Sequence, residues 1–110
     1  MKPPDLSQLG ENAKSAAQML KGLAHETRLL AICFIGDGEK NVMELESHLG
    51  TTQANISQHM AKLRSLGLVE NRKAGNQVYY RVKDKSTLKL VHALQDAYCP
   101  RPRKPSKRTP

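Results

Sequence analysis

Apolar residues recur along the first third of the chain at spacings of three and four, which predicts amphipathic helices. A first helix is expected over residues 12–23, with the apolar stripe Ala13, Ala16, Ala17, Leu20 and Leu23. The next segment, from His25 to Ile35, is apolar on most sides, and a helix of that kind is expected at the centre of a domain. Two glycines at 36–38 end it.

Two short helices joined by a tight glycine turn are predicted next. Asn41 and Glu44 have the spacing of a capping box at the start of a helix over residues 41–50. Thr51 or Thr52 caps the following helix. Two short helices in this order are typical of a helix-turn-helix. The inner face of the second helix consists of Ile56, Met60 and Leu63.

A β-hairpin and a last helix complete the predicted fold. Residues 68–72 and 77–82 are rich in β-branched and aromatic side chains and flank a turn at 73–76. A final helix is expected over 86–98. The order helix, helix, helix-turn-helix, hairpin, helix predicts a mainly α fold with a small β-hairpin wing, that is, a winged helix-turn-helix.

The 110 residues suffice for one domain with a modest core. All six prolines lie at the two ends of the chain. We therefore expect a flexible N-terminal arm over 1–9, a DNA-binding and dimerisation domain over 10–99, and a basic, proline-rich disordered tail over 100–110. The apolar faces of the first and last helices exceed what one small domain can cover, which favours a homodimer.

The net charge of +8 is concentrated in the tail. Five of the 18 basic residues lie in 100–110, which contains no acid, so residues 1–99 keep 13 basic against 10 acidic side chains. Such a tail attracts phosphate backbones without sequence preference, although a purely solubilising role explains it equally well.

The sequence contains no run of about 18 to 20 apolar residues and no secretory signal, so we expect a cytoplasmic protein without a membrane partner. Nor does it contain a glycine-rich phosphate loop, or a nucleophile with a base partner beside a plausible pocket. An enzyme is not expected, and neither is a cofactor.

The candidate DNA-binding residues lie on the second helix of the helix-turn-helix and on the wing. Residues 51–67 contain no acid, and Asn and Gln side chains both donate to and accept from adenine edges. A polar solvated helix face is the alternative interpretation. The residues expected at the DNA are Gln53, Ala54, Asn55, Ser57, Gln58, His59 and Lys62 on the helix, and Arg72, Lys73 and Asn76 on the wing.

Cys33 and Cys99 are the two cysteines of the chain. In a reducing compartment they are compatible with separate thiols, metal ligands or a redox pair. Cys33 lies in an apolar segment, where a cysteine is often a small buried hydrophobe. From the residues alone these alternatives stay open.

Four segments together resemble the ArsR/SmtB repressor family, namely residues 23–29 (LAHETRL), 56–63 (ISQHMAKL), 67–69 (GLV) and 72–80 (RKAGNQVYY). The resemblance implies a homodimer paired through its first and last helices. It also implies binding to double-stranded operator DNA with two-fold pseudo-symmetry, and release when an inducer binds.

The resemblance also addresses the sensor. The helix at 42–48 lacks the cysteines that hold soft metals in many members, and the last helix offers only His92, with Asp96 as the nearest further candidate, so no metal site is expected. The positions of Cys33 and Cys99 are similar to those in the dithiol branch, the BigR/SqrR/HlyU-like repressors. That similarity implies sensor thiols that become linked by a disulfide or polysulfide chain, with a persulfide, polysulfide or oxidant as inducer.

Two alternatives accompany this interpretation. The same fold could sense a thiophilic metal or metalloid through the two cysteines, with His92 as a further ligand. A winged-helix DNA-binding protein without any inducer is the second.

Overall fold

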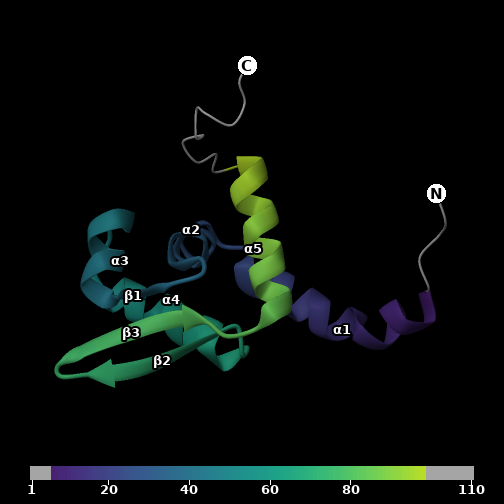
Figure 1. The fold of residues 1–110 in the computed structure, drawn as a ribbon, viewed down its shortest axis with the longest axis horizontal. Coiled ribbons are helices and arrows are strands. Elements are labelled where there is room, and N and C mark those ends of the chain that lie inside the picture. Colours follow the sequence, from purple (N-terminus) through teal and green to yellow (C-terminus); the bar gives the residue numbers. More distant parts are fainter. Residues whose placement is uncertain (1–5, 99–110) are drawn as a thin grey trace, which may run out of the picture.

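The computed structural model describes residues 6–98, which form five helices and one antiparallel sheet of strand order β1-β3-β2 (Figure 1). The predicted winged helix-turn-helix with a mainly α composition is confirmed. In chain order the elements are α1 (Leu6–Leu23), α2 (Glu26–Ile35), β1 (Glu39–Asn41), α3 (Val42–Leu49), α4 (Gln53–Ser65), β2 (Val69–Ala74), β3 (Gln77–Val82) and α5 (Lys85–Tyr98).

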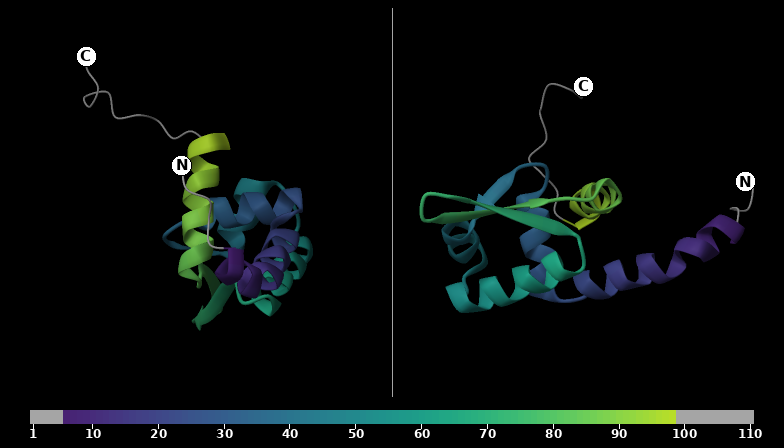
Figure 2. Two further views of the ribbon diagram at one scale, coloured as in Figure 1. Left: turned by 90° about the vertical axis from the view of Figure 1, so that its right-hand side faces the viewer. Right: turned by 90° about the horizontal axis from the view of Figure 1, so that it is seen from below.

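The first helix is longer than predicted. It begins at Leu6 rather than Asn12, so residues 6–9 of the expected flexible arm are helical. Gly10 is a poor helix former and hides this continuation in the sequence. The N-terminal half of α1 projects from the rest of the domain (Figures 1 and 2), and only its last turn, at Gly22 and Leu23, is buried.

Helix α2 lies at the centre of the domain, and Ala31, Ile32 and Ile35 are buried. The expectation that it is buried on most sides is wrong for one face, because Leu30 is 47% exposed in the single chain. The helix begins after His25, whose ring nitrogen Nδ1 accepts a hydrogen bond from the backbone N–H of Thr27 at 3.1 Å.

The helix-turn-helix is formed by α3 and α4, and its predicted caps are observed. Asn41 and Glu44 form a reciprocal capping box with two hydrogen bonds of 2.8 Å. Gly50 ends α3 at a φ of 66°, a left-handed conformation that glycine adopts without penalty. Thr52 is the N-cap of α4. The core stripe Ile56, Met60 and Leu63 is fully buried.

The sheet contains one strand that the sequence did not predict. β1 is only three residues long and polar, and it pairs with β3, with Glu39 opposite Arg81. The hairpin itself is confirmed, but β2 extends to Ala74, which leaves the two-residue turn Gly75-Asn76. Gly75 has a φ of 66°, as the first position of a type II′ turn requires.

Helix α5 begins at Lys85, one residue before the predicted start, and packs on α2 through the fully buried Val91. Asp84 caps it by accepting hydrogen bonds of 3.0 Å from the backbone N–H and the hydroxyl of Thr87. No helix between residues 6 and 98 is both long enough and apolar enough to cross a membrane.

Candidate nucleic-acid interface and thiol site

Helix α4 lies along one edge of the domain, and the β2–β3 hairpin extends beyond the body of the molecule (Figure 2, right). The predicted DNA-contacting residues of α4 differ in exposure. Those that are exposed are Gln53, Ala54, Gln58 and Lys62. Those that are half-buried are Asn55, Ser57 and His59. The outward face of the helix therefore holds four of the seven predicted residues.

Asn55 is one of the two predicted amides for base contacts, and its side chain is already hydrogen-bonded. Its Nδ2 donates to the hydroxyl of Thr51 at 2.9 Å, one turn back. A bidentate contact with adenine needs the amide donor and acceptor together. The side chain of Gln58 is exposed, and it is therefore better placed than that of Asn55 for such a contact.

His59 faces the start of α2 instead of standing clear of the domain surface. Its Nδ1 lies 3.3 Å from Nη1 of Arg28, and its ring centroid lies 4.3 Å from that of His25. Burial, followed by the nearby charges of His25 and Arg28, lowers the pKa of His59. These contacts argue against the phosphate contact that the sequence suggested for this side chain.

The wing residue Arg72 is held by an ion pair. Its guanidinium donates to both carboxylate oxygens of Glu39 on β1, at 2.9 and 2.8 Å, and lies 4.8 Å from the ring centroid of Tyr79. The hydrogen bond from Arg72 lowers the pKa of Glu39, and the same bond raises the pKa of Arg72. Lys73 and Asn76 are exposed near the tip of the hairpin.

The predicted sensor thiol Cys33 is half-buried on α2. Its backbone carbonyl accepts a hydrogen bond of 2.8 Å from Nε2 of Gln95 on α5. Cys99 lies outside the described residues, directly after Tyr98, where α5 ends. The helix that leads to Cys99 in the sequence thus packs against the helix that contains Cys33.

A second polar contact joins the same two helices. His92 Nε2 on α5 lies 2.9 and 3.0 Å from the carboxylate oxygens of Asp37, which follows α2. Helical spacing from His92 does not lead to this pair, because Asp37 lies outside α5. Among residues 6–98, no group of three or more His, Cys, Asp or Glu side chains could hold a metal ion.

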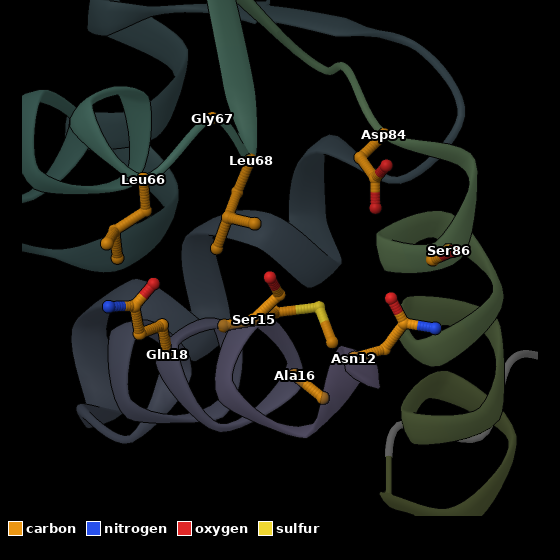
Figure 3. A pocket seen from close by; sticks show the side chains of 10 residues that line it. Asn12, Ser15, Ala16, Gln18, Leu66, Gly67, Leu68, Asp84 and Ser86 are labelled. Atoms are coloured by element: carbon orange, nitrogen blue, oxygen red, sulfur yellow. The ribbon is translucent and has the colours of Figure 1, made fainter. Parts of the chain in front are cut away.

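The projecting helix α1 borders an open pocket of about 530 Å³ (Figure 3). Asn12, Ser15 and Met19 of α1 form one wall. The other walls are the turn between α4 and β2, at Leu66–Leu68, and the start of α5, at Asp84 and Ser86. Outside the pocket lining, α1 also exposes large apolar side chains: Leu6, Leu9 and Leu20 are 66%, 52% and 53% exposed.

Residues 25–71 match the family model described as "Bacterial regulatory protein, arsR family". The biofilm growth-associated repressor of Xylella fastidiosa is 37% identical over 89 residues, which cover 81% of this chain and 78% of the relative. The chain belongs to the ArsR family. Like the other members named below, this ArsR-family protein is a transcriptional regulator.

This ArsR-family regulator is also similar to two further proteins, in sequence and in structure. The transcriptional activator HlyU of Vibrio cholerae is 36% identical over 97 residues, or 88% of this chain and 90% of the relative. The structure of reduced HlyU has a TM-score of 0.81, with 35% identity over 84% of this chain and 98% of that chain. A homodimeric winged helix-turn-helix DNA-binding domain from Mycobacterium bovis has a TM-score of 0.70, with 26% identity over 88% of this chain and 89% of that chain.

The named relatives are transcriptional regulators and not enzymes, in agreement with the exclusion drawn from the sequence. The match also covers α3 and α4, so the outward face of α4 belongs to the helix-turn-helix of an ArsR-family regulator. The residues that sequence analysis missed are the partners Glu39, Asp37, Arg28 and Gln95. Each of them lies on a different element from the residue that it contacts, so no local pattern could identify it.

Proposed function

We propose that this regulator is a homodimeric repressor that is released from its operator when Cys33 and Cys99 become linked. The observation that favours this mechanism is the hydrogen bond from Gln95 to the carbonyl oxygen of Cys33. It holds α5 against α2 beside the first thiol, four residues before the second thiol in the sequence. A link between the two thiols would then change how α5 packs on α2, the helix at the centre of the domain.

The chemistry of the link follows from a persulfide as oxidant. One thiolate attacks the sulfane sulfur of R–S–SH, which gives a protein persulfide and the thiol RSH. The second thiolate attacks the inner sulfur, which forms the Cys33–Cys99 disulfide and releases H₂S. The two protein thiols lose two electrons, and the sulfane sulfur gains them. A further equivalent of persulfide would lengthen the link to a polysulfide chain by the same exchange.

On the DNA side, we infer that α4 lies in the major groove. Gln58 and Ala54 are exposed at positions suited to base edges and thymine methyl groups, and Gln53 and Lys62 to phosphates. Asn55 and Ser57 stand at the margin of this face. Lys73 and Asn76 of the wing are placed for the backbone or the minor groove.

The homodimer is supported by an apolar seam on α1. Its members follow one another at spacings of three or four and are exposed in the single chain. They are Leu6, Leu9, Ala13, Ala17 and Leu20. A partner copy that covered this seam would bury large side chains that a single chain leaves in water. The relative from Mycobacterium bovis is described as homodimeric, which supports a dimer without specifying its interface.

Selection of bound sequences from a random duplex library tests the DNA-binding part of the proposal. A two-fold pseudo-symmetric site, bound at least about 10³-fold more tightly than random DNA at fixed salt, is expected. Binding without such discrimination would instead indicate a winged-helix protein without sequence-specific control.

The double variant Cys33→Ser/Cys99→Ser separates the dithiol from a thiophilic metal sensor. The dithiol proposal expects it to bind the selected site as well as the wild type does, and to stay bound in persulfide. Titration with Zn²⁺, Cu⁺ or As(III) is the complementary measurement. Stoichiometric metal binding by the wild type that releases DNA, and that the double variant loses, would replace the dithiol with the metal alternative.

A further inference from the structure

Arg28 lies where the end of α1, the start of α2 and the middle of α4 meet. Its Nε donates a hydrogen bond of 2.6 Å to the carbonyl oxygen of Gly22, in the last turn of α1. Its Nη1 lies 3.3 Å from Nδ1 of His59 on α4. One half-buried guanidinium therefore joins the projecting helix to the proposed DNA-contacting helix.

The protonation state of this junction follows from its donors. Arginine stays charged and has no acceptor, so Nδ1 of His59 accepts the hydrogen bond and is unprotonated. His25 lies beside it, and its Nδ1 accepts a hydrogen bond from the backbone N–H of Thr27. The two rings lie 4.3 Å apart. The junction therefore pairs the Arg28 cation with a neutral His59 imidazole.

We propose that Arg28 and His59 are positioning residues that fix α4 relative to α1, and that protonation of His59 releases this hold. The inference rests on the proposed function, in which α4 contacts the DNA and α1 pairs the two protomers. A dimer needs its two α4 helices about 34 Å apart to enter successive major grooves. A junction that couples α4 to α1 therefore sets the spacing of the half-sites.

Packing near the junction is close as well. A Cβ atom at Gly22 would lie 2.4 Å from Cδ1 of Leu66, which follows α4. The end of α1 and the end of α4 thus touch directly. Arg28 adds a polar contact to His59, about two turns before Leu66 on α4. A change in the Arg28–His59 contact is expected to tilt α4 about this close approach.

The pH dependence has a definite sign. His59 faces the titratable His25 and the fixed charge of Arg28, and burial together with these charges lowers its pKa. The neutral form is favoured in the folded protein, so the junction is intact at and above the ordinary histidine pKa of 6.5 and is lost only as the pH falls through the lowered pKa of His59. A histidine that contacted a phosphate would behave in the opposite way, because DNA would favour its protonated form.

The test is affinity for the selected site between pH 5.5 and pH 8 at constant ionic strength. We expect wild-type affinity to fall towards pH 5.5, by less than the roughly tenfold that an unshifted histidine pKa would give, because the pKa of His59 is lowered. The variant His59→Asn keeps an acceptor near the position of Nδ1 and does not titrate. It is expected to bind as the wild type does at pH 8 and to lose the dependence on pH.

Arg28→Lys and His59→Leu complete the design, measured on selected sites with one base pair inserted or removed between the half-sites. Both variants are expected to bind less tightly at every pH and to discriminate less between spacings. His48→Asn is the matched histidine control, because His48 stacks on Phe34 away from the junction, and it should keep the wild-type profile. Thermal unfolding verifies that each variant is folded.

Wild-type affinity that rises as the pH falls would overturn the inference, and so would a His59→Asn variant with the wild-type pH profile. Failure of the wild type to select any sequence is a different result. It would contradict the proposed DNA-binding function rather than the role of the junction.

Discussion

Nε2 of Gln95 lies 2.8 Å from the carbonyl oxygen of Cys33 and donates a hydrogen bond to it. This bond joins α5 to α2 at the residue that contains the proposed sensor thiol. Cys99 directly follows α5 in the sequence. We therefore expect the packing of α5 on α2 to control how readily the second thiol reaches the first.

Replacement of Gln95 by Met removes the bond while roughly preserving side-chain volume. Loss of about 1 kcal/mol from the contact is expected to slow formation of the Cys33–Cys99 link about fivefold. Quenched samples analysed by intact mass after addition of a persulfide give the rate. Lys89→Gln, an exposed change on the same helix, should leave the rate unaltered. Equal rates for Gln95→Met and the wild type would show that this contact does not bring the thiols together.

Gln58 is the amide that is best placed for base contact, since it is exposed whereas Asn55 is bonded to Thr51. Gln58→Ala is expected to cost about 1–3 kcal/mol on the selected site. Fluorescence anisotropy on selected and random duplexes measures the difference. An equal loss on both duplexes would mean that Gln58 does not contribute to sequence discrimination.

We expect Glu39 and DNA phosphates to compete for Arg72. Glu39→Gln weakens the ion pair, so Arg72 is expected to gain a phosphate contact, which strengthens binding and steepens the salt dependence by about 0.9 in log K against log salt. The pair cannot be broken by pH in the range used for binding, because Arg72 holds the pKa of Glu39 below its ordinary value of 4.5.

Glu70→Gln serves as the control for the altered charge of Glu39→Gln. It removes the same charge from β2, on the other side of β3, where Glu70 is paired with Arg81 instead. The account predicts a smaller gain in affinity and an unchanged salt slope. Identical slopes for the two variants would assign the effect to net charge alone.

The seam on α1 predicts a specific effect on assembly. Leu20→Glu places a charge in the proposed interface of both protomers. Because burial of a leucine is worth about 1.5–3 kcal/mol, the dissociation constant of the dimer is expected to rise about a hundredfold or more. Sedimentation over a range of concentrations measures it. Met43→Glu changes an apolar residue on α3 that is also more than half exposed, and it should not alter assembly. If the two variants had the same dimer dissociation constant, α1 would not form the interface.

Local patterns in the sequence were sufficient to predict most of the fold. The capping box of Asn41 and Glu44, the turn at Gly75 and the stripe of Ile56, Met60 and Leu63 all depend on residues close together in the chain. β1 escaped prediction because it is held by pairing with β3 rather than by its own composition.

The proposed site was harder to predict than the fold for a related reason. The type of a side chain suggests what it can bind, but not what already binds it. Arg72 and His59 have the chemistry of phosphate contacts, yet Glu39 and Arg28 occupy them from other elements. Such pairings arise from tertiary packing and have no signature at helical or strand spacing.

Operator binding before and after persulfide treatment tests the central claim most directly, with the intact mass recorded for each sample. The account predicts that the reduced protein binds the selected site, that treatment produces an intramolecular link between Cys33 and Cys99, and that affinity then collapses. Unchanged affinity in a sample whose mass shows the two cysteines linked would contradict the claim that this dithiol controls DNA binding.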